Sequence, residues 1–339
     1  MLKKMARSIL LTSLLIIMIG AFRSPFGVAQ KIEHQPILID SDNDFVSSQF
    51  PGTGTKEDPY IIEDYKITST GSMTNAIEVK GTSKYFIIRN CQITASYIGI
   101  LVEGVSAGTA SVINNTIASS TNKGGGIVLG ANGVLVSNNT CTNFVEGIHT
   151  NYASDCIIRY NNFSNNHYHG ISLRYSSNNV VTNNTVMNNE GYGVLIIRES
   201  ALNKVFNNTI IDNAKLESYN WDDIYTFQLN HQALDAGSNN IWYDAENKRG
   251  NVWSDYSGTG EYVIDGSAHA VDKYPQKGQS TSPATEPPQE SGNTQTGVSG
   301  FMAESIMIRR DYCHSHIITR STISNYDSNT SFAMIVVFH

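Results

Sequence analysis

Apolar and polar residues alternate in short runs along the middle of the chain, and these runs recur at a nearly constant spacing. The apolar residue that follows each Asn pair recurs at intervals of 24, 24, 22, 23 and 24 positions, at Ile93, Ile117, Cys141, Phe163, Val186 and Ile210. A small residue followed by an aliphatic one recurs at Ala76-Ile77, Gly99-Ile100, Gly126-Ile127, Gly147-Ile148, Gly170-Ile171 and Gly193-Val194. Alternation over such short stretches is the period of a half-buried strand. The pattern therefore predicts short strands in a repeat of about 23 residues.

Six such repeats favour an all-β fold, a right-handed parallel β-helix in which each coil hydrogen-bonds to the next at ~4.8 Å spacing. No Pro lies between positions 60 and 274, which agrees with this prediction because Pro would break the ladders. Two inward columns are expected to fill the core: Ile77, Ile100, Ile127, Ile148, Ile171 and Val194, and Val79, Val102, Leu129, Thr150, Leu173 and Ile196.

Asn is concentrated in the repeats, with 22 of the 34 Asn residues between positions 114 and 213. Asn tolerates the left-handed backbone angles of sharp corners, and stacked amides hydrogen-bond to one another. The same runs create glycosylation sequons at Asn114, Asn138, Asn162, Asn183 and Asn207. A structural Asn ladder is the favoured interpretation, and glycosylation of exposed corners stays open.

The composition divides the chain into segments. Residues 1–29 have a basic start, a 14-residue mostly apolar run and small residues before Ala29, which predicts a cleaved signal peptide. We expect the β-helix domain over 30–275, with caps at about 37–70 and 241–275 and a protruding loop at about 214–230. Residues 276–300 predict a disordered linker, and 301–339 form a poorly defined tail. The mature protein is thus expected to be secreted or extracellular, at the cell surface, with no transmembrane span.

Charge and cysteine content exclude several classes of function. The net charge of −7 does not favour nucleic-acid binding, which uses clustered Lys and Arg. Cys91, Cys141, Cys156 and Cys313 show neither a CxxC spacing nor a zinc pattern, so free thiols are expected. No metal site and no cofactor are predicted.

Polar and aromatic residues gather on one predicted face in the later coils. Tyr152 and Tyr175 lie 23 positions apart and should stack on one another. The ligand-binding candidates are His149, Asn151, Tyr152, Ser172, Tyr175, Tyr192 and Trp221. Aromatic rings suit the C–H surfaces of sugars, and amide or guanidinium groups suit their hydroxyls. For an enzyme, the catalytic candidates are Glu146, His169 and Arg174. A solvated face without a ligand is the alternative interpretation.

Two segments carry a resemblance to a known family. Pro51-Gly52-Thr53-Gly54-Thr55 with the following residues to Ile62, and Gly250-Asn251-Val252-Trp253 with the following residues to Pro275, resemble the entry and the closing cap of NosD-like proteins. This resemblance covers about residues 37–275, and it implies a carbohydrate-binding or sugar-hydrolase type β-helix as found in secreted archaeal members. The family is associated with copper, but the domain before the linker has only Met73 and Met187 and no Met-x-x-Met, so copper binding is not expected here.

These observations predict an exported, monomeric β-helix protein that binds polysaccharide or a surface glycan. The first alternative is a polysaccharide lyase or glycoside hydrolase on the same face. That alternative lacks the sets of Asp residues that such enzymes use, because the relevant coils offer only Glu146 and Asp155. The second alternative is a purely structural surface or adhesion rod.

Overall fold

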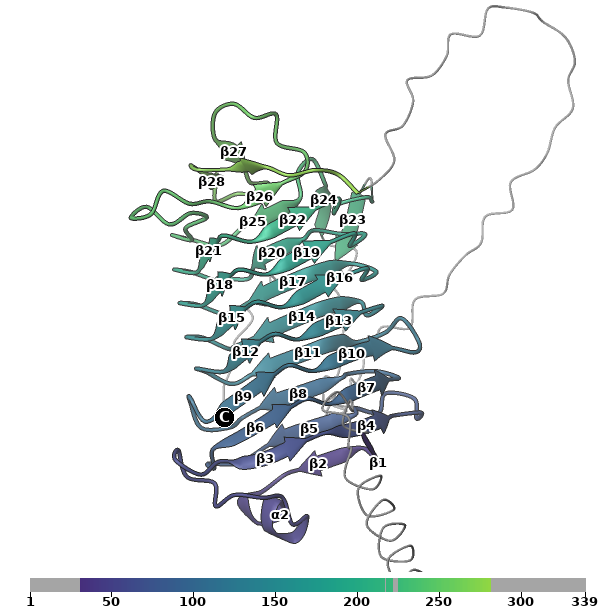
Figure 1. The fold of residues 1–339 in the computed structure, drawn as a ribbon. Helices are drawn as coiled ribbons and strands as arrows, with labels where there is room; N and C mark the ends of the chain where they lie inside the picture. The colour runs from purple at the N-terminus through teal and green to yellow at the C-terminus, as the bar shows by residue number, and fades with distance from the viewer. Residues whose placement is uncertain (1–30, 217, 222–224, 282–339) are drawn as a thin grey trace, which may run out of the picture. The chain divides into compact units, whose positions relative to one another are not determined.

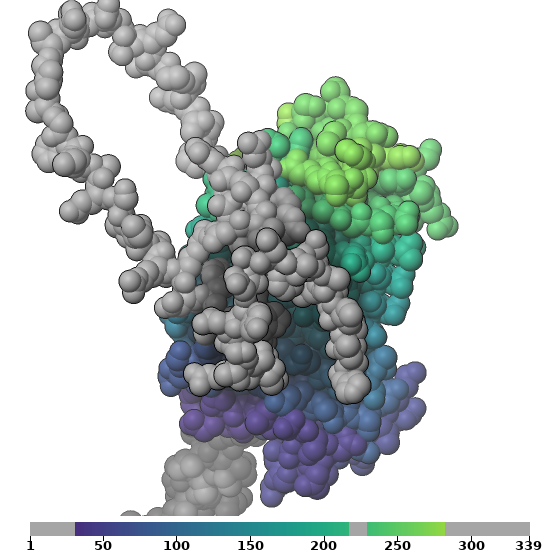
Figure 2. Space-filling view, turned by 180° about the vertical axis from the view of Figure 1, so that it is seen from behind, coloured from purple at the N-terminus to yellow at the C-terminus, as the bar shows by residue number. Residues whose placement is uncertain are grey.

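The structure, a computed structural model, describes residues 31–216, 218–221 and 225–281. Three parallel sheets form the sides of a solenoid, and consecutive strands of the chain pass from one sheet to the next (Figure 1). The space-filling view shows the same order as bands of colour that follow one another from the N-terminal to the C-terminal end (Figure 2). The predicted all-β parallel β-helix is confirmed.

We name the three sheets A, B and C. Sheet A contains β1 (Ile32–His34), β4 (Tyr65–Thr68), β7 (Gln92–Ala95), β10 (Thr116–Ser119), β13 (Thr140–Thr142), β16 (Asn162–Ser164), β19 (Thr185–Met187), β22 (Thr209–Ile211), β26 (Val252–Trp253) and β29 (Gln276–Lys277). Sheet B contains β2 (Ile37–Ile39), β5 (Ile77–Lys80), β8 (Ile100–Glu103), β11 (Gly125–Gly130), β14 (Glu146–Asn151), β17 (His169–Arg174), β20 (Val194–Ile197) and β25 (Ala233–Asp235). Sheet C contains β3 (Tyr60–Glu63), β6 (Phe86–Arg89), β9 (Ala110–Ile113), β12 (Leu135–Ser137), β15 (Ile157–Arg159), β18 (Val180–Thr182) and β21 (Lys204–Phe206).

The apolar columns of the repeat face the interior and stay in register. Ile127 pairs with Ile148, and Ile148 with Ile171, and each of these side chains is fully buried. Every residue of the two predicted inward columns is likewise buried, including Thr150. Because strand residues alternate between the two faces, this register places the intervening side chains on the outside of the solenoid.

A buried amide ladder runs through the corner between sheets C and A. In it, Asn115, Asn139, Asn161, Asn184, Asn208 and Asn251 stack in consecutive coils. Each side-chain amide donates to the Oδ1 of the next residue at 2.9–3.0 Å. Two further ladders contain Asn166, Asn189, Asn213 and Gln232, and Asn179, Asn203 and Asn240. These bonds satisfy polar groups that would be costly to bury alone.

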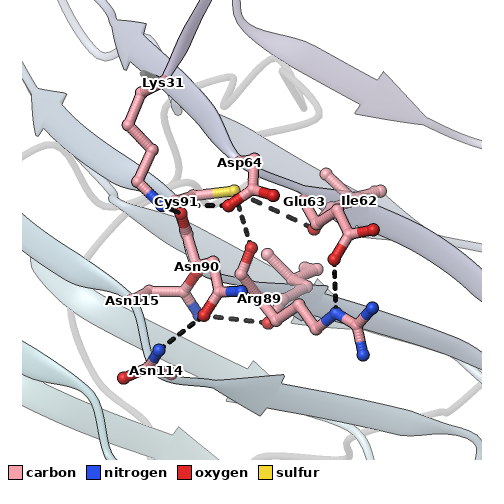
Figure 3. Close-up of polar contacts among 10 residues, drawn as sticks. Lys31, Ile62, Glu63, Asp64, Arg89, Asn90, Cys91, Asn114 and Asn115 are labelled. Carbon is pink, nitrogen blue, oxygen red and sulfur yellow. Dashed lines mark hydrogen bonds and ion pairs between the residues drawn. The ribbon is translucent and has the colours of Figure 1, made fainter. Parts of the chain in front are cut away.

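The first residue of each Asn pair has a different role from the second. Asn114, Asn138, Asn183 and Asn207 adopt φ angles of 57–58°, the left-handed region that Asn tolerates. Figure 3 shows the start of this outer row, where the Asn114 amide donates to Asn90 Oδ1 at 2.5 Å and Lys31 contacts Asp64 at 3.1 Å. The sequon residues Asn114, Asn138 and Asn162 are exposed, and Asn183 and Asn207 are half-buried.

The two ends of the solenoid are closed by different means. At the N-terminal end, α2 (Asp42–Ser47) places Phe45 over the core, where its ring stacks on Tyr60 at 4.6 Å. At the C-terminal end, Trp253 is buried and stacks on Tyr262 at 4.0 Å, next to the short pair β27 (Tyr262–Val263) and β28 (Val271–Asp272). Aromatic rings suit this purpose because each one covers a large apolar area.

Three carboxylates terminate the amide ladders near the C-terminal end. Asn251 donates to Asp272 at 3.2 Å, Asn240 to Asp235 at 2.9 Å, and Gln232 to Asp255 at 2.6 Å. In all three ladders the side-chain N–H groups point toward this end, so the last amide of each ladder needs a hydrogen-bond acceptor. That acceptor does not itself have to donate a hydrogen bond to a further residue. A carboxylate meets that requirement, because an ionised carboxylate only accepts hydrogen bonds.

Several expected segment boundaries can be compared with the structure. Strand β29 continues sheet A to Lys277, beyond the expected boundary at 275, because the Gln276 backbone N–H donates to the Asn251 carbonyl at 2.9 Å. Between Asn213 and Gln232 a hairpin of β23 (Ser218–Trp221) and β24 (Tyr225–Gln228) is inserted. The expected signal peptide, the linker beyond residue 281 and the tail at 301–339 lie outside the described residues. Among the described residues, no helix has the length and apolar character needed to span a membrane.

Candidate functional site

The candidate residues lie on the outer face of sheet B, in strands β14 and β17 and the coils that follow. Glu146 pairs with His169, His149 with Ser172, and Asn151 with Arg174, as the repeat spacing predicts. Side chains from two consecutive coils are therefore brought within contact distance. The structure divides them into a buried polar cluster and an exposed aromatic pair.

An ion pair lies at the centre of the buried polar cluster. Arg174 Nη2 lies 2.5 Å from Glu146 Oε1, and both side chains are less than a tenth exposed. His149 Nδ1 lies 3.3 Å from Glu146 Oε2, and Arg174 Nη1 lies 3.2 Å from His149 Nε2. Burial raises the pKa of Glu146, and the charge of Arg174 opposes that rise. Burial, followed by Arg174, lowers the pKa of His149 well below its ordinary value, so this imidazole is neutral at pH 7.

His169 lies in the same column as Glu146 and is fully buried. Its Nδ1 accepts the Tyr192 backbone N–H at 3.0 Å, so a neutral ring carries its proton on Nε2. Burial first, and then Arg174, lower the pKa of His169 to about 3. The His169 and Tyr192 rings stack at 5.9 Å. This arrangement holds the imidazole in one tautomer, which is a condition for directed proton transfer.

His231 extends this column, and sequence reasoning missed it. Val194 pairs with Ala233 and the Gly193 N–H donates to the Gln232 carbonyl, which puts Tyr192 level with His231. Asp265 orients this imidazole with a contact of 2.7 Å to Nδ1, and it also accepts the Tyr192 hydroxyl at 3.4 Å. The 214–230 insertion hides this register in the sequence. The continuing amide ladder from Asn213 to Gln232 is the signal that could have found it.

The exposed aromatic pair consists of Tyr152 and Tyr175, at the ends of β14 and β17. Their rings stack at 4.6 Å with an interplanar angle of 5°, as the 23-residue spacing predicts. Tyr152 is 66% exposed, Tyr175 is half-buried and Asn151 beside them is exposed. Both tyrosines have positive φ angles, 54° and 47°, which direct the chain sharply round the corner between sheets B and C.

The structure does not leave all of the candidates open to a ligand. Ser172 and Tyr192 are fully buried although they lie on the outer face, and Arg174 is nearly so. Tyr192 packs with Leu195, Ile197 and Leu234 in a second apolar cluster, against which Leu229 and Ala236 also pack. Ser172 and Tyr192 therefore do not lie open to a ligand in this structure, and their contact with a ligand stays a prediction. Trp221 lies in β23, and the structure describes its backbone but not its side chain.

Metal-binding side chains do not converge within the described part of the chain. No group of three or more His, Cys, Asp or Glu residues there could hold an ion. Cys91, Cys141 and Cys156 are buried free thiols, as expected, and burial raises the pKa of Cys91 and of Cys156 to about 11. Such thiols remain protonated and are weak ligands at neutral pH. Met73 is exposed near the N-terminal end, far along the chain from Met187 in β19.

Comparison with known proteins agrees with the architecture. A family model described as a right handed beta helix region matches residues 75–232. No curated protein matches the chain. Among solved structures, the A-module of the mannuronan C-5 epimerase AlgE6 from Azotobacter vinelandii is similar, with 16% identity and a TM-score of 0.35, over 62% of this chain and 62% of that chain. A likeness this distant carries no argument about activity. Residues 75–232, and the coils that flank them in the same three sheets, form a right-handed parallel β-helix.

Proposed function

We propose that the protein is an exported, monomeric β-helix protein that binds polysaccharide or a surface glycan at the outer face of sheet B. The observation that carries this proposal is the stack of the exposed Tyr152 on the half-buried Tyr175, with the exposed Asn151 beside it. Aromatic faces attract the C–H surfaces of sugars, and an exposed amide can both donate to and accept from hydroxyls. A rod without a ligand would have no need for an exposed ring held in place by a second ring stacked on it.

Removing one ring is expected to weaken glycan binding. Tyr152→Ala and Tyr175→Ala should each reduce the affinity for a glycan found on an array, and their losses should not add, because the two rings are in direct contact. Isothermal titration would measure this. Tyr160→Ala is a matched control, because Tyr160 is also an exposed tyrosine with a positive φ but lies at the corner between sheets C and A. Unchanged affinity in both site variants would exclude this face.

Export is tested separately. Mass spectrometry of the protein recovered from outside the cell should find an N-terminus at or near Gln30, since the proposed cleavage follows Ala29. Light scattering should give the mass of a monomer. An intact leader on the recovered protein would favour a membrane anchor.

A second candidate function, a polysaccharide lyase or glycoside hydrolase, is favoured by one observation. Glu146, His169, Tyr192 and His231 occupy one column in four consecutive coils, which is an unusual sequence of acid–base groups. Neutral His169 and the orientation of His231 by Asp265 suit proton transfer. Burial of Glu146 and His169 weighs against this candidate, because a substrate would have to reach them.

Two variants separate catalysis from binding. If the protein turns over a bound glycan, Glu146→Gln and His231→Gln should each lower kcat by about 10²-fold or more while binding persists. His167→Gln is the matched control, because His167 is exposed to a similar degree and contacts a carboxylate, Glu190, at 3.4 Å outside this column. Equal turnover in the site variants and the control would rule out this column as a catalytic site.

A further inference from the structure

The turn from sheet B to sheet C is shorter in the coil that precedes Tyr152 than in the coil that contains it. In the coil of β11 and β12, this turn takes six positions, from Leu129 to Leu135. In the next coil the equivalent turn takes seven, from Thr150 to Ile157. The coil after that, which contains Tyr175, again takes seven. One residue of the Tyr152 turn therefore has no counterpart in the coil before it.

That extra residue is Tyr152 itself. Ala131 and Ala153 are both buried in the core and occupy equivalent places in their turns, and the Gly133 N–H donates to the Ser154 carbonyl just beyond them. Gly130 directly precedes Ala131, whereas Asn151, its counterpart, is separated from Ala153 by Tyr152. Tyr152 is therefore the residue that the longer turn adds. Its ring stacks on Tyr175 on one side. On the other side, toward β11, no described side chain lies in register with it, which explains why Tyr152 is the more exposed of the two rings.

The coil beside this open ring face, that of β11, carries little bulk, and the coil before it, that of β8, supplies one carboxylate. Gly130 has no side chain, and a Cβ built there would lie 3.0 Å from Glu103 Cγ and 3.6 Å from Glu103 Oε1. The Gly104 N–H donates to the Gly130 carbonyl at 3.0 Å, which fixes the two coils next to one another. Glu103, an exposed residue that pairs with Gly130, therefore borders the space that a side chain at Gly130 would fill, one coil beyond Gly130 as seen from Tyr152.

We propose that the open face of Tyr152 binds one neutral pyranose ring, whose hydroxyls donate to the carboxylate of Glu103. This inference rests on the proposed glycan-binding function and names its sugar class. One coil spacing of ~4.8 Å matches the thickness of a single sugar ring. An aromatic face attracts C–H groups, and an O–H···O⁻ hydrogen bond to a carboxylate is stronger than one to a neutral acceptor. The negative charge of Glu103 repels the carboxylate of a uronic acid, so acidic sugars are excluded from this subsite.

The test uses the full chain and four probes: cellotetraose and mannotetraose as neutral ligands, and tetragalacturonate and tetramannuronate as acidic ones. Titration calorimetry should detect binding of a neutral probe and weaker binding of the acidic ones. Tyr152→Ala should weaken binding of the neutral probe by about tenfold or more, and Tyr175→Ala by less, since Tyr175 only supports the ring from behind. Glu103→Lys should shift the preference toward the acidic probes.

Covering the open face provides the sharpest variant. Insertion of one Tyr between Gly130 and Ala131 gives this turn the length of its neighbour, so the new ring should stack on Tyr152 and abolish binding while Tyr152 is retained. In Gly130→Gln, the new side chain lies at the level of the inserted ring without a change in turn length. Only the flexible Glu103 side chain must move to make room for it. Thermal melting followed by circular dichroism shows which of these variants are folded. Glycan binding by a folded variant then decides whether the sugar lies on the open face of Tyr152.

Each outcome has a distinct meaning. Loss of binding in the folded covered variants, together with loss in Tyr152→Ala, supports the subsite. If Tyr152→Ala loses binding but the covered variants keep it, the sugar does not lie on the open face, and glycan binding by the tyrosine pair still stands. Preference of the wild-type chain for the acidic probes would overturn the sugar class. If the wild-type chain binds neither these probes nor any glycan on an array, the proposed function itself fails.

Discussion

Replacing Asn184 by Asp is expected to unfold the β-helix at neutral pH. The Asn184 amide is buried and donates to the Ile158 carbonyl, the Thr182 carbonyl and Asn208 Oδ1 at 2.9–3.2 Å. An Asp carboxylate has no hydrogen to donate, so it would face three acceptors and add a buried charge. Each buried group left unsatisfied costs about 1–3 kcal/mol, and the sum approaches the whole stability of a domain, roughly 5–15 kcal/mol.

The neighbouring residue provides the control for this prediction. Asn183 is half-buried on the outside of the corner with a φ of 58°, which Asp also tolerates, so Asn183→Asp should change the free energy of unfolding little. Urea unfolding followed by circular dichroism would measure both variants. Equal stability of Asn184→Asp and Asn183→Asp would show that the inner ladder does not stabilise the solenoid.

Replacing Arg174 by Met is expected to destabilise the protein by about 3–5 kcal/mol, because it leaves Glu146 buried without its counter-charge. The effect should depend on pH in a defined direction. Burial already raises the pKa of Glu146 in the folded protein above its ordinary value of 4.5, and removal of Arg174 removes the charge that opposes that rise. The folded variant therefore binds the proton more tightly than the unfolded chain does.

It follows that the stability lost in Arg174→Met relative to the wild-type protein should be smallest below pH 4.5 and should grow as pH rises through the folded-state pKa of Glu146. Urea midpoints measured across this pH range would show the slope. The double variant Glu146→Gln with Arg174→Met removes the buried charge, so it should recover most of the lost stability at pH 7. A double variant as unstable as Arg174→Met alone would mean that the stability is lost through the packing of the Arg174 side chain and not through the ion pair.

The sequence alone determined the repeat and much of the register. A coil of about 23 residues places Ile148 over Ile171 because strands in consecutive coils pair directly, so that a fixed spacing in the sequence becomes a fixed contact in space. The same arithmetic predicts the stack of Tyr152 on Tyr175 and the pairing of Asn151 with Arg174. Local periodicity is sufficient for such contacts since each coil touches mainly its neighbours.

Only the tertiary structure decided which outer residues are accessible. Alternation places Ser172 on the outer face, but it says nothing about what covers that face; in the structure Ser172 is fully buried, and it pairs with Leu195 of the second apolar cluster. His231 escaped notice for a related reason, since an insertion between Asn213 and Gln232 breaks the spacing while the ladder bond across it keeps the register. Spacing along the chain predicts the contacts that repeat from coil to coil. The coverage of a face depends on segments that do not repeat, and so do contacts across an insertion, such as that of His231 with Asp265. Only the folded chain brings such segments together.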